Sequence, residues 1–512
     1  MNAAQMALPP RETSVRGSPP NSWSVVVCGL VVMGIAVRLP TMPLTPDVDD
    51  SVFFVRGVIR YSIADMRPHW PGYPVYIWLG KLIAAAVDDP TLGLHLLSAL
   101  ASALTAWPLA LVTRSWALSL GVPEATAGRC GWATAALWLV TPMAWVTGGQ
   151  IVSDPLGLLC GATLLALCVT GADGGPGRWL AAATLAGIML GVRLVNVTML
   201  GPLLAASWRR RAERWRGIPA PLALLLAGAA GALPWMIWLL ARDPWAFVHG
   251  AGAHVGGHFT RWGESLWTDH HPLTRPLRAL RTLAVYGLGG RLTDWPGLIV
   301  SAAWTAVLAM AAAVRPWRGP VSRVVLLWGL PHLLYVFVGH DIEFPRYMLS
   351  AVALLTVLTG LVPVRFGHAG LAALAATVAA MMAVSAPLAL RQHHQPPTEV
   401  RVARFLALRR HPAIAIVDHP GLPFYLEGTE GDVVWAAAAA EEIPRWQQTW
   451  AGAGREVFAT APPPQDPGGW VPVAHFCRDP LINPYLSREI WLFAPVSFEP
   501  AAGGRGLECD ER

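Results

Sequence analysis

The sequence predicts an α-helical membrane protein that crosses the bilayer many times and ends in a small α/β domain. Of the 512 residues, 54% are hydrophobic and only 14% are charged, roughly half the charged fraction of an average soluble domain. A soluble enzyme and a disordered chain both need a more polar composition, so both classes are excluded. After Leu390 the pattern changes, because short strand-like and helix-like segments alternate, as in an α/β domain.

The predicted elements begin with residues 1–22, which are polar and rich in proline, and which we expect to form a disordered cytoplasmic tail. The apolar run after it lacks a small-residue cleavage site, so we interpret it as a retained anchor. Residues 23–390 then form a transmembrane domain of about eleven helices, several near the ~20 residues that a bilayer requires. The segment 75–87 is shorter and contains Lys81, which places it on the membrane surface. The predicted spans are 23–39, 91–112, 131–147, 155–170, 179–192, 195–208, 219–241, 295–314, 324–339, 347–364 and 369–390.

The arginines predict the orientation of these spans. Of 38 basic residues only Lys81 is a lysine, which indicates a compositional bias, so the net charge of +6 is no sign of a nucleic-acid partner. With a cytoplasmic N-terminus, the cytoplasmic connections hold twelve arginines against only Glu124, Asp173 and Glu213, as the positive-inside rule requires. We therefore expect a multi-pass protein of the bacterial inner membrane with an extracytoplasmic C-terminal domain. Those connections are 113–130, 171–178, 209–218, 315–323 and 365–368.

The tail 391–512 is long enough for one core of its own. We expect helices at 399–410 and 436–451, and strands at 413–417, 432–435, 455–460, 471–476 and 490–493. Asp418-His419-Pro420-Gly421 follows a strand end, but without a ligand-binding fingerprint beside it we interpret it as a structural turn. Outside the cytoplasm, Cys477 and Cys509 could form a disulfide.

The first external loop, 40–90, holds the densest polar chemistry of the chain. Three aspartates follow the first span closely, and carboxylates beside a hydrophobic belt are costly unless they are paired or useful. The alternative is a solvated loop in which Asp50 caps a helix over 51–63. Arg56 lies one helical turn before Arg60, where it could pair with the aspartates or bind an anion. The aspartates are Asp47, Asp49 and Asp50.

A rigid turn is predicted from His69 to Pro74, because proline fixes φ and Gly72 permits a tight bend. Its aromatic residues would also suit ordinary anchoring at the membrane interface. Two short spans meet at another break close to Arg193, where the arginine needs an anionic partner or reaches the headgroups.

These features in this order resemble a known family. An apolar anchor ends in Asp49-Asp50, a helix carrying Phe53 and Phe54 follows, and the turn His69–Pro74 leads into an apolar segment. The succession is similar to the first luminal loop of the glycosyltransferase-C superfamily, within it most to the protein O-mannosyltransferase-like membrane transferases, which include the lipid A aminoarabinose transferases. The likeness spans roughly 22–390 and includes Leu96–Leu100, Gly191–Arg193 and Pro345–Tyr347.

This resemblance implies an inverting transferase that works on the external face and for which a divalent metal is optional; we expect no cofactor. Its donor would be a sugar on a polyprenyl phosphate in the membrane lipid, and its acceptor a hydroxyl of a glycan, lipid or protein. By position in the family, Asp49 acts on the acceptor. The family usually has Asp-Glu where this chain has Asp-Asp, with Asp47 in addition, which leaves the choice among the three aspartates open.

The same reaction defines the other candidate residues. Transfer from a lipid phosphate to a hydroxyl needs a base and cations for the growing phosphate charge, but no acid for the leaving group. Arg56, Arg193 and Arg346 are the candidates for the phosphate, and Arg346 could instead pair with Glu343. The substrate-site candidates are His69, Tyr73 and Asp154, the last of which could simply be a helix N-cap.

Rival functions remain a transporter or lipid flippase, and a catalytically silent assembly subunit. A transporter would need functional charges at the midplane of its spans and often shows inverted repeats, whereas the carboxylates here cluster at one membrane face.

In the loop 242–294, His254 and His258 have the spacing of metal ligands on one helix face. The glycines between them weaken a helix there, so we expect a flexible or acceptor-facing loop.

Overall fold

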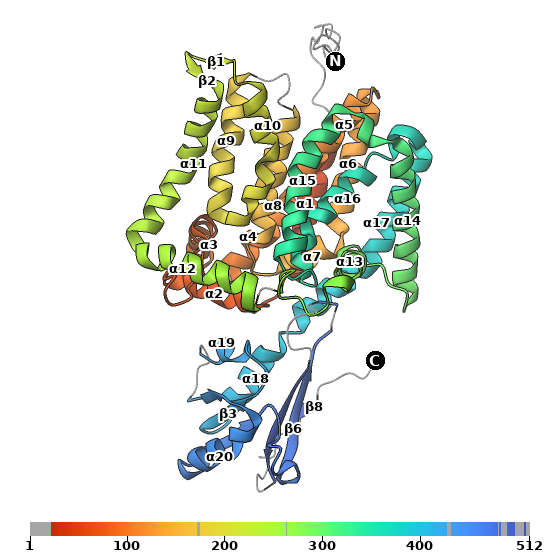
Figure 1. The fold of residues 1–512 in the computed structure, drawn as a ribbon. Helices are drawn as coiled ribbons and strands as arrows, with labels where there is room; N and C mark the ends of the chain where they lie inside the picture. The colour runs from red at the N-terminus through yellow and green to blue at the C-terminus, as the bar shows by residue number, and fades with distance from the viewer. Residues whose placement is uncertain are drawn as a thin grey trace.

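The computed structural model describes residues 22–170, 175–262, 264–427, 432–479, 481–482, 489–496 and 506–507. Helices from α1 (Ser22–Arg38) to α17 (Pro363–His394) form a bundle, and a smaller domain with a β-sheet lies beyond one end of it (Figure 1). The predicted tail 1–22 lies outside the described residues except for Ser22. The other long elements of the bundle are α4 (Pro90–Leu104), α5 (Ala106–Ser119), α6 (Glu124–Val140), α7 (Pro142–Gly149), α8 (Asp154–Thr170), α9 (Pro176–Val192), α10 (Gly201–Arg209), α11 (Ala220–Arg242), α14 (Trp295–Val314), α15 (Pro320–Gly339) and α16 (Leu349–Thr359).

Within the described part of the chain, six helical segments are long and apolar enough to cross a membrane. The predicted count of eleven is not confirmed, because several apolar runs form shorter helices. The run at 131–147 is divided at Pro142 between α6 and α7, since proline cannot donate a backbone hydrogen bond. The six segments are Trp23–Thr41, Pro90–Ser119, Ala220–Arg242, Trp295–Arg318, Pro320–Gly339 and Pro363–Ala407.

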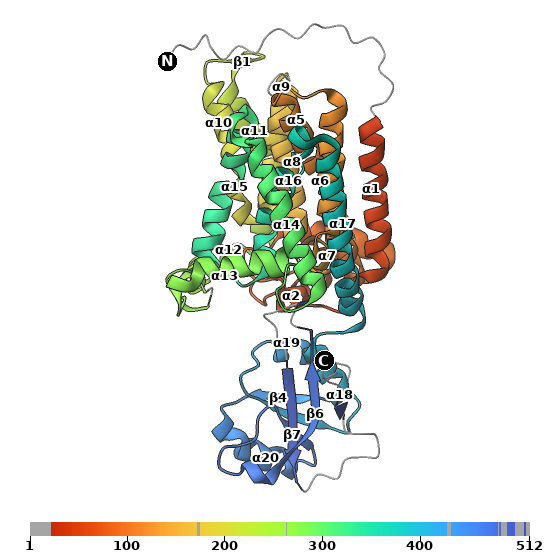
Figure 2. The ribbon, with the colours of Figure 1, turned by 90° about the vertical axis from the view of Figure 1, so that its right-hand side faces the viewer.

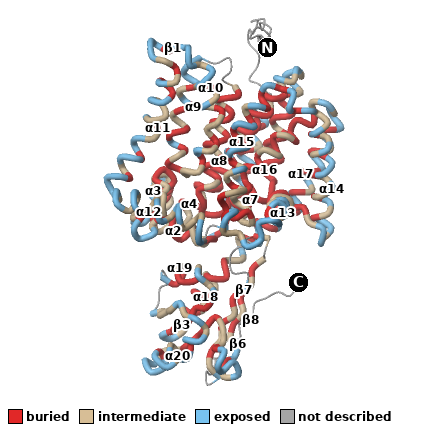
Figure 3. Tube along the Cα trace, in the orientation of Figure 1, coloured by how far each residue is buried: buried red, intermediate tan, exposed pale blue. Residues whose placement is uncertain are grey.

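The outer helices of the bundle expose apolar side chains, whereas α8 in its interior is almost entirely buried (Figure 3). On α11, for example, Leu222, Leu225, Leu226 and Ile237 are all exposed. An apolar surface of this extent suits lipid and not water. Together with the long apolar helices, it identifies an integral membrane protein.

The predicted break near Arg193 is present. Helix α9 ends at Val192, Arg193 is extended with φ −162° and ψ 116°, and the chain continues as the 3₁₀-helix η3 (Leu194–Leu200) into α10. An extended residue between two helices points its side chain away from both helix axes. The break therefore leaves Arg193 free to turn into the space between α8 and α15.

The two ends of the bundle differ. Figures 1 and 2 show the start of α1 and the arginine-rich hairpin of β1 (Arg214–Trp215) and β2 (Ile218–Pro219) at one end. The opposite end, which faces the small domain, carries the first predicted external loop. Its helices α2 (Asp49–Ile59) and α3 (Pro74–Val87) lie there together with α12 (Pro244–Gly257) and α13 (Arg275–Arg281). The predicted catalytic loop and the C-terminal domain thus lie on the same side.

The C-terminal domain is built on a six-stranded sheet in the order β4-β3-β5-β7-β6-β8. Strand β3 is parallel to its neighbours β4 and β5, with Ile414 beside Trp435 and Phe458, whereas β7 is antiparallel to β5 and β6. Every residue of β3 is buried, because helices cover both faces. The elements are α18 (Thr398–Ala407), β3 (Pro412–Ile416), α19 (Leu422–Leu426), β4 (Val434–Ala437), α20 (Ile443–Gly452), β5 (Glu456–Ala459), β6 (Trp470–Cys477), β7 (Glu489–Pro495) and β8 (Gly506–Leu507).

The predicted strands of this domain are found within one or two residues of their expected bounds, but the predicted helix 436–451 begins only at Ile443 in α20. Cys477 is disulfide-bonded. Its predicted partner, Cys509, lies outside the described residues.

A buried ion pair joins the small domain to the first loop. Asp47 is fully buried and pairs with Arg478, and its other oxygen accepts hydrogen bonds from the amides of Gln150 (2.8 Å) and Gln392 (3.0 Å). A buried carboxylate that loses its cation costs far more than an exposed one. Asp47 therefore acts as an anchor between the two parts of the chain.

We predict that Arg478→Gln destabilises this junction by about 3 kcal/mol, because it leaves the Asp47 charge buried without its cation. The readout is the melting temperature of the purified protein in detergent. The matched control is Arg455→Gln, which removes an ion pair to the exposed Asp432, worth at most about 1 kcal/mol. Equal melting temperatures for the two variants would contradict the anchoring role.

Candidate functional site

The first turn of α2 presents two adjacent carboxylates. Ser51 fixes the start of the helix, because its hydroxyl donates to the backbone oxygen of Ile151 (2.9 Å) and accepts from the amide of Val48 (3.3 Å). Asp49 and Asp50 are the first two helical residues, where negative charge is favoured by the helix dipole. Two neighbouring side chains on a helix point in different directions, so the two carboxyl groups meet different surroundings.

Asp50 is held in its ionised form. Its carboxylate accepts a 2.6 Å hydrogen bond from Arg346 Nη2, and Nδ1 of His69 lies 3.7 Å from it. Burial opposes ionisation, but Arg346 and His69 outweigh it and lower the pKa of Asp50 to about 2. Asp50 is therefore a fixed negative charge at neutral pH.

Asp49 lies in the opposite situation. Its Oδ1 atom is buried and has no hydrogen-bond partner among the described residues. Burial raises the pKa of Asp49 to about 7, helped by the negative charges of Glu399 and Asp50 and opposed by Arg346. A carboxyl group with a pKa near neutrality can take up and release a proton, which is the property of a general base.

Two partly buried arginines flank one aromatic ring beside this acid pair. Arg193 pairs with Asp154 (2.7 Å), and the guanidinium groups of Arg193 and Arg346 lie 5.4 Å and 5.1 Å from the centre of the Tyr347 ring. Nε and Nη1 of Arg346 are buried without a hydrogen-bond partner in the described structure. Buried donors of this kind are unfavourable unless a ligand satisfies them.

Arg193 lines an apolar cavity of about 260 Å³. Arg193 and His340 line both this cavity and a smaller one of about 30 Å³, which Asp154, Arg346 and Tyr347 also line. Burial, together with the nearby His69 and His258, lowers the pKa of His254 to about 4, so this part of the wall is neutral. The larger cavity is otherwise walled mainly by aliphatic and aromatic residues: Trp70, Pro71, Tyr73, Leu194, Val195, Val197, Val255, Phe259 and Tyr335.

The predicted turn connects the acid pair to the cavity. The Gly72 amide donates to the His69 oxygen (2.9 Å), and Gly72 has φ +89°, a conformation that glycine adopts without strain. His69 Nε2 lies 3.0 Å from the hydroxyl of Tyr73. The turn therefore places His69 against Asp50 and Tyr73 on the cavity wall.

The structure brings seven of the nine predicted site residues to this region and separates two. Arg56 pairs with Glu427 (2.7 Å) and donates to the Phe424 oxygen (2.7 Å), so it contacts the C-terminal domain. Asp47 is enclosed by its three partners, as described above. The seven that gather here are Asp49, Asp50, His69, Tyr73, Asp154, Arg193 and Arg346.

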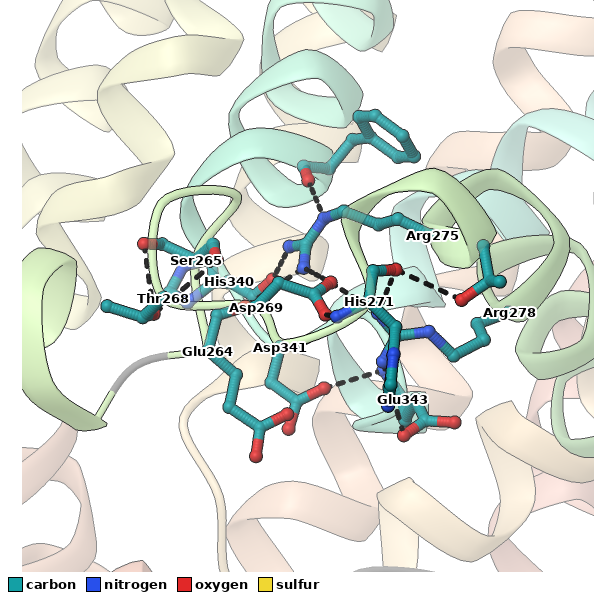
Figure 4. A network of polar contacts seen from close by, with 12 residues as sticks. Glu264, Ser265, Thr268, Asp269, His271, Arg275, Arg278, His340, Asp341 and Glu343 are labelled. Carbon is teal, nitrogen blue, oxygen red and sulfur yellow. Dashed lines mark hydrogen bonds and ion pairs between the residues drawn. The ribbon is translucent and has the colours of Figure 1, made fainter.

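A polar network supports the far wall of the cavity (Figure 4). Arg275 is buried, donates to the backbone oxygens of Phe337 (2.6 Å) and Glu264 (2.9 Å) and to that of His340, and pairs with Asp269 (2.8 Å). These bonds occupy carbonyl groups at the end of α15 that the helix itself cannot satisfy. They fix the loop before α13 against α15 and so hold His340 in the cavity wall.

The sequence did not predict this network, because Arg275 and its partners Phe337 and His340 lie in separate segments of the chain and no pattern connects them. Glu343, the alternative partner considered for Arg346, instead lies 3.6 Å from Arg278, and Arg346 pairs with Asp50.

The metal geometry considered for His254 and His258 is not formed. His258 Nε2 lies 2.5 Å from the Gly339 oxygen, and the His254 ring stacks on His69 with 5.7 Å between the ring centres. In the part of the chain that the structure describes, no three His, Cys, Asp or Glu side chains are grouped so that they could hold a metal ion.

Comparison with known proteins identifies the fold. No family model and no curated protein matches the sequence. The structure is similar to that of ArnT from Cupriavidus metallidurans bound to undecaprenyl phosphate, with a TM-score of 0.55 and 14% identity over 94% of this chain and 99% of that chain. The apo state of the same protein gives a TM-score of 0.54 and 14% identity over 92% and 98% of the chains. The predicted resemblance is thereby confirmed at the level of the fold, which this chain shares with ArnT.

We predict that the Asp49 carboxyl titrates near pH 7, whereas Asp50 remains ionised. Infrared titration of the purified protein should show a protonated carboxyl band that grows as the pH falls through neutrality. The band should be missing from Asp49→Asn and present in Asp65→Asn, which changes an exposed aspartate of the same loop. A band that persists in Asp49→Asn would contradict the assignment.

Proposed function

We propose that this protein is a membrane glycosyltransferase that moves a sugar from a polyprenyl-phosphate donor to an acceptor hydroxyl. The reaction takes place on the extracytoplasmic face, in a bacterial inner membrane, with inversion at the anomeric carbon. Asp49 is the general base, and Arg193 and Arg346 bind the donor phosphate.

The observation that carries this proposal is the position of the two arginines. Arg193 lines the apolar cavity of about 260 Å³, and Arg346, which pairs with Asp50, lines with Arg193 the smaller cavity of about 30 Å³. A lipid phosphate combines an apolar tail with a charged head, and this site offers apolar walls on one side and unsatisfied guanidinium donors on the other. Arginine suits phosphate because its planar donors match the phosphate oxygens.

The proposed chemical step uses few groups. The acceptor oxygen bonds to the anomeric carbon while its proton passes to the Asp49 carboxylate. The bond between the anomeric carbon and the phosphate oxygen breaks, and its electron pair leaves with the lipid phosphate. Arg193 and Arg346 stabilise that charge as it grows, so no acid is needed for the leaving group. Attack opposite to the leaving group inverts the anomeric centre.

Asp50 and Asp154 have a different part in this scheme. Each is paired with one of the arginines, Asp50 with Arg346 and Asp154 with Arg193. Such pairs hold the guanidinium groups in place before the donor arrives, which lowers the cost of ordering them on binding. The comparison supports the choice of donor, because ArnT, which shares the fold, was seen with undecaprenyl phosphate.

We predict that Asp49→Asn reduces sugar transfer by about 10²–10⁴-fold, the usual contribution of a general base. The assay follows loss of sugar from a panel of polyprenyl-phosphate sugars in the presence of membrane extract. Asp65→Asn serves as the control and should keep full activity. Full activity of Asp49→Asn, with normal membrane insertion, would end the catalytic assignment.

Arg346→Lys should weaken the binding of undecaprenyl phosphate by about tenfold or more. A guanidinium group can donate to Asp50 and to the phosphate at the same time, and the ammonium group of lysine cannot take over both sets of hydrogen bonds. Binding is measured with undecaprenyl phosphate itself on the detergent-purified protein. Arg281→Lys, at the exposed end of α13, is the control. Unchanged affinity of the Arg346 variant would show that the phosphate binds elsewhere.

A further inference from the structure

The C-terminal domain reaches the acid pair directly. Its short helix α19 packs on α2, with the rings of Phe53 and Phe424 4.8 Å apart between their centres, and Arg56 of α2 pairs with Glu427. The Asp47–Arg478 pair holds the same junction from the other side of the loop. The residues that face Asp49 from this domain are therefore held in a defined position.

Gly421 is the first of these residues. It precedes α19, and a β-carbon at this position would lie 2.8 Å from Asp49 Oδ1 and 3.2 Å from Oδ2. Real β-carbons essentially never lie within 3.0 Å of such an atom, so a larger residue would displace the carboxyl group. Gly421 has φ −76° and ψ −30°, which any residue adopts. The backbone conformation does not require glycine at this position. The lack of space beside Asp49 requires it.

Glu399 is the second. It is buried in the first turn of α18, where the Thr398 hydroxyl donates to its carboxylate (3.0 Å), and its negative charge disfavours ionisation of Asp49. The other charged and titratable groups that act on Asp49 are Asp50 from α2, Arg346 from the 3₁₀-helix η8 (Pro345–Met348), and Tyr425 from α19. Glu399 and Tyr425 come from the C-terminal domain.

We propose that the C-terminal domain completes the catalytic site: Gly421, at the start of α19, leaves the room in which the Asp49 carboxyl lies, so this domain positions the catalytic base. This inference rests on the proposed function, in which Asp49 is the base. The domain then does more than cover the site. Because its pKa is near neutrality, Asp49 binds the proton of the acceptor hydroxyl more strongly than an aspartate with an ordinary pKa would.

The influence of the C-terminal domain on Asp49 is tested by infrared titration of Asp49 in full-length Glu399→Gln. Loss of the neighbouring negative charge should lower the midpoint by about one pH unit, a tenfold change in proton affinity. Glu399→Asp keeps the charge and should titrate close to the unchanged protein. The control is Glu441→Gln, which removes a charge from an exposed position of the same domain. A midpoint that stays the same or rises in Glu399→Gln would overturn the role of Glu399.

Gly421→Ala tests the steric part. We expect turnover of the donor found in the panel to fall about tenfold, with unchanged affinity for undecaprenyl phosphate, because the added methyl displaces Asp49 and not the arginines. Gly452→Ala, where an added β-carbon has no neighbour within 4 Å, should behave like the unchanged protein. Unchanged turnover in Gly421→Ala would overturn the positioning role; if this variant does not fold, the Glu399 titration decides the proposal.

The titration needs no substrate, so its failure is distinct from failure of the proposed function. If no sugar donor is consumed by the unchanged protein, the proposed function fails while the Asp49 midpoint is still measured. If transfer depends on Asp49 but neither variant differs from its control, the function stands and the role of the C-terminal domain is wrong.

Discussion

Two neighbouring carboxylates out of bulk water cannot both be ionised cheaply, and the site is organised around this constraint. Asp50 pairs with the cation Arg346, whereas Asp49 has an unpartnered oxygen and is subject to the negative charge of Glu399. One carboxyl group is therefore a permanent anion and the other a proton acceptor near neutrality. The same chemical group serves two purposes because the protein gives each copy different neighbours.

This division depends on segments that are far apart in the sequence. Arg346 comes from the turn that opens α16, Arg193 from the break after α9, and Gly421 from the small domain. Each segment is fixed by its own local device. The extended backbone of Arg193, between α9 and η3, directs its own side chain. The Arg275 network holds the end of α15, and the Asp47–Arg478 pair holds the small domain. The cavity and the acid pair keep their relative positions because these devices act together.

Local features of this structure could be predicted from the sequence. The break at Arg193, the turn at His69–Pro74 and the strands of the C-terminal domain depend on proline, glycine and short apolar periods. The number of spans could not, because apolar runs of similar composition form long helices in some places and short ones, interrupted by proline, in others. The ion-pair partners of Asp47 and Arg56 could not be predicted either. Arg478 and Glu427 lie hundreds of residues away in the chain, and no periodicity connects them to these residues. The turn at Gly421 was expected to be structural, and only its position in space shows that it contacts Asp49.

The central claim is that a lipid phosphate binds beside the acid pair at the end of the bundle that faces the C-terminal domain. Its most direct test is an experimental structure of the protein in a lipid nanodisc with undecaprenyl phosphate. We predict density for the phosphate within hydrogen-bonding distance of Arg193 and Arg346, with the part of the lipid tail next to the phosphate in the apolar cavity. Phosphate density at the opposite end, among the arginines around β1, would contradict it.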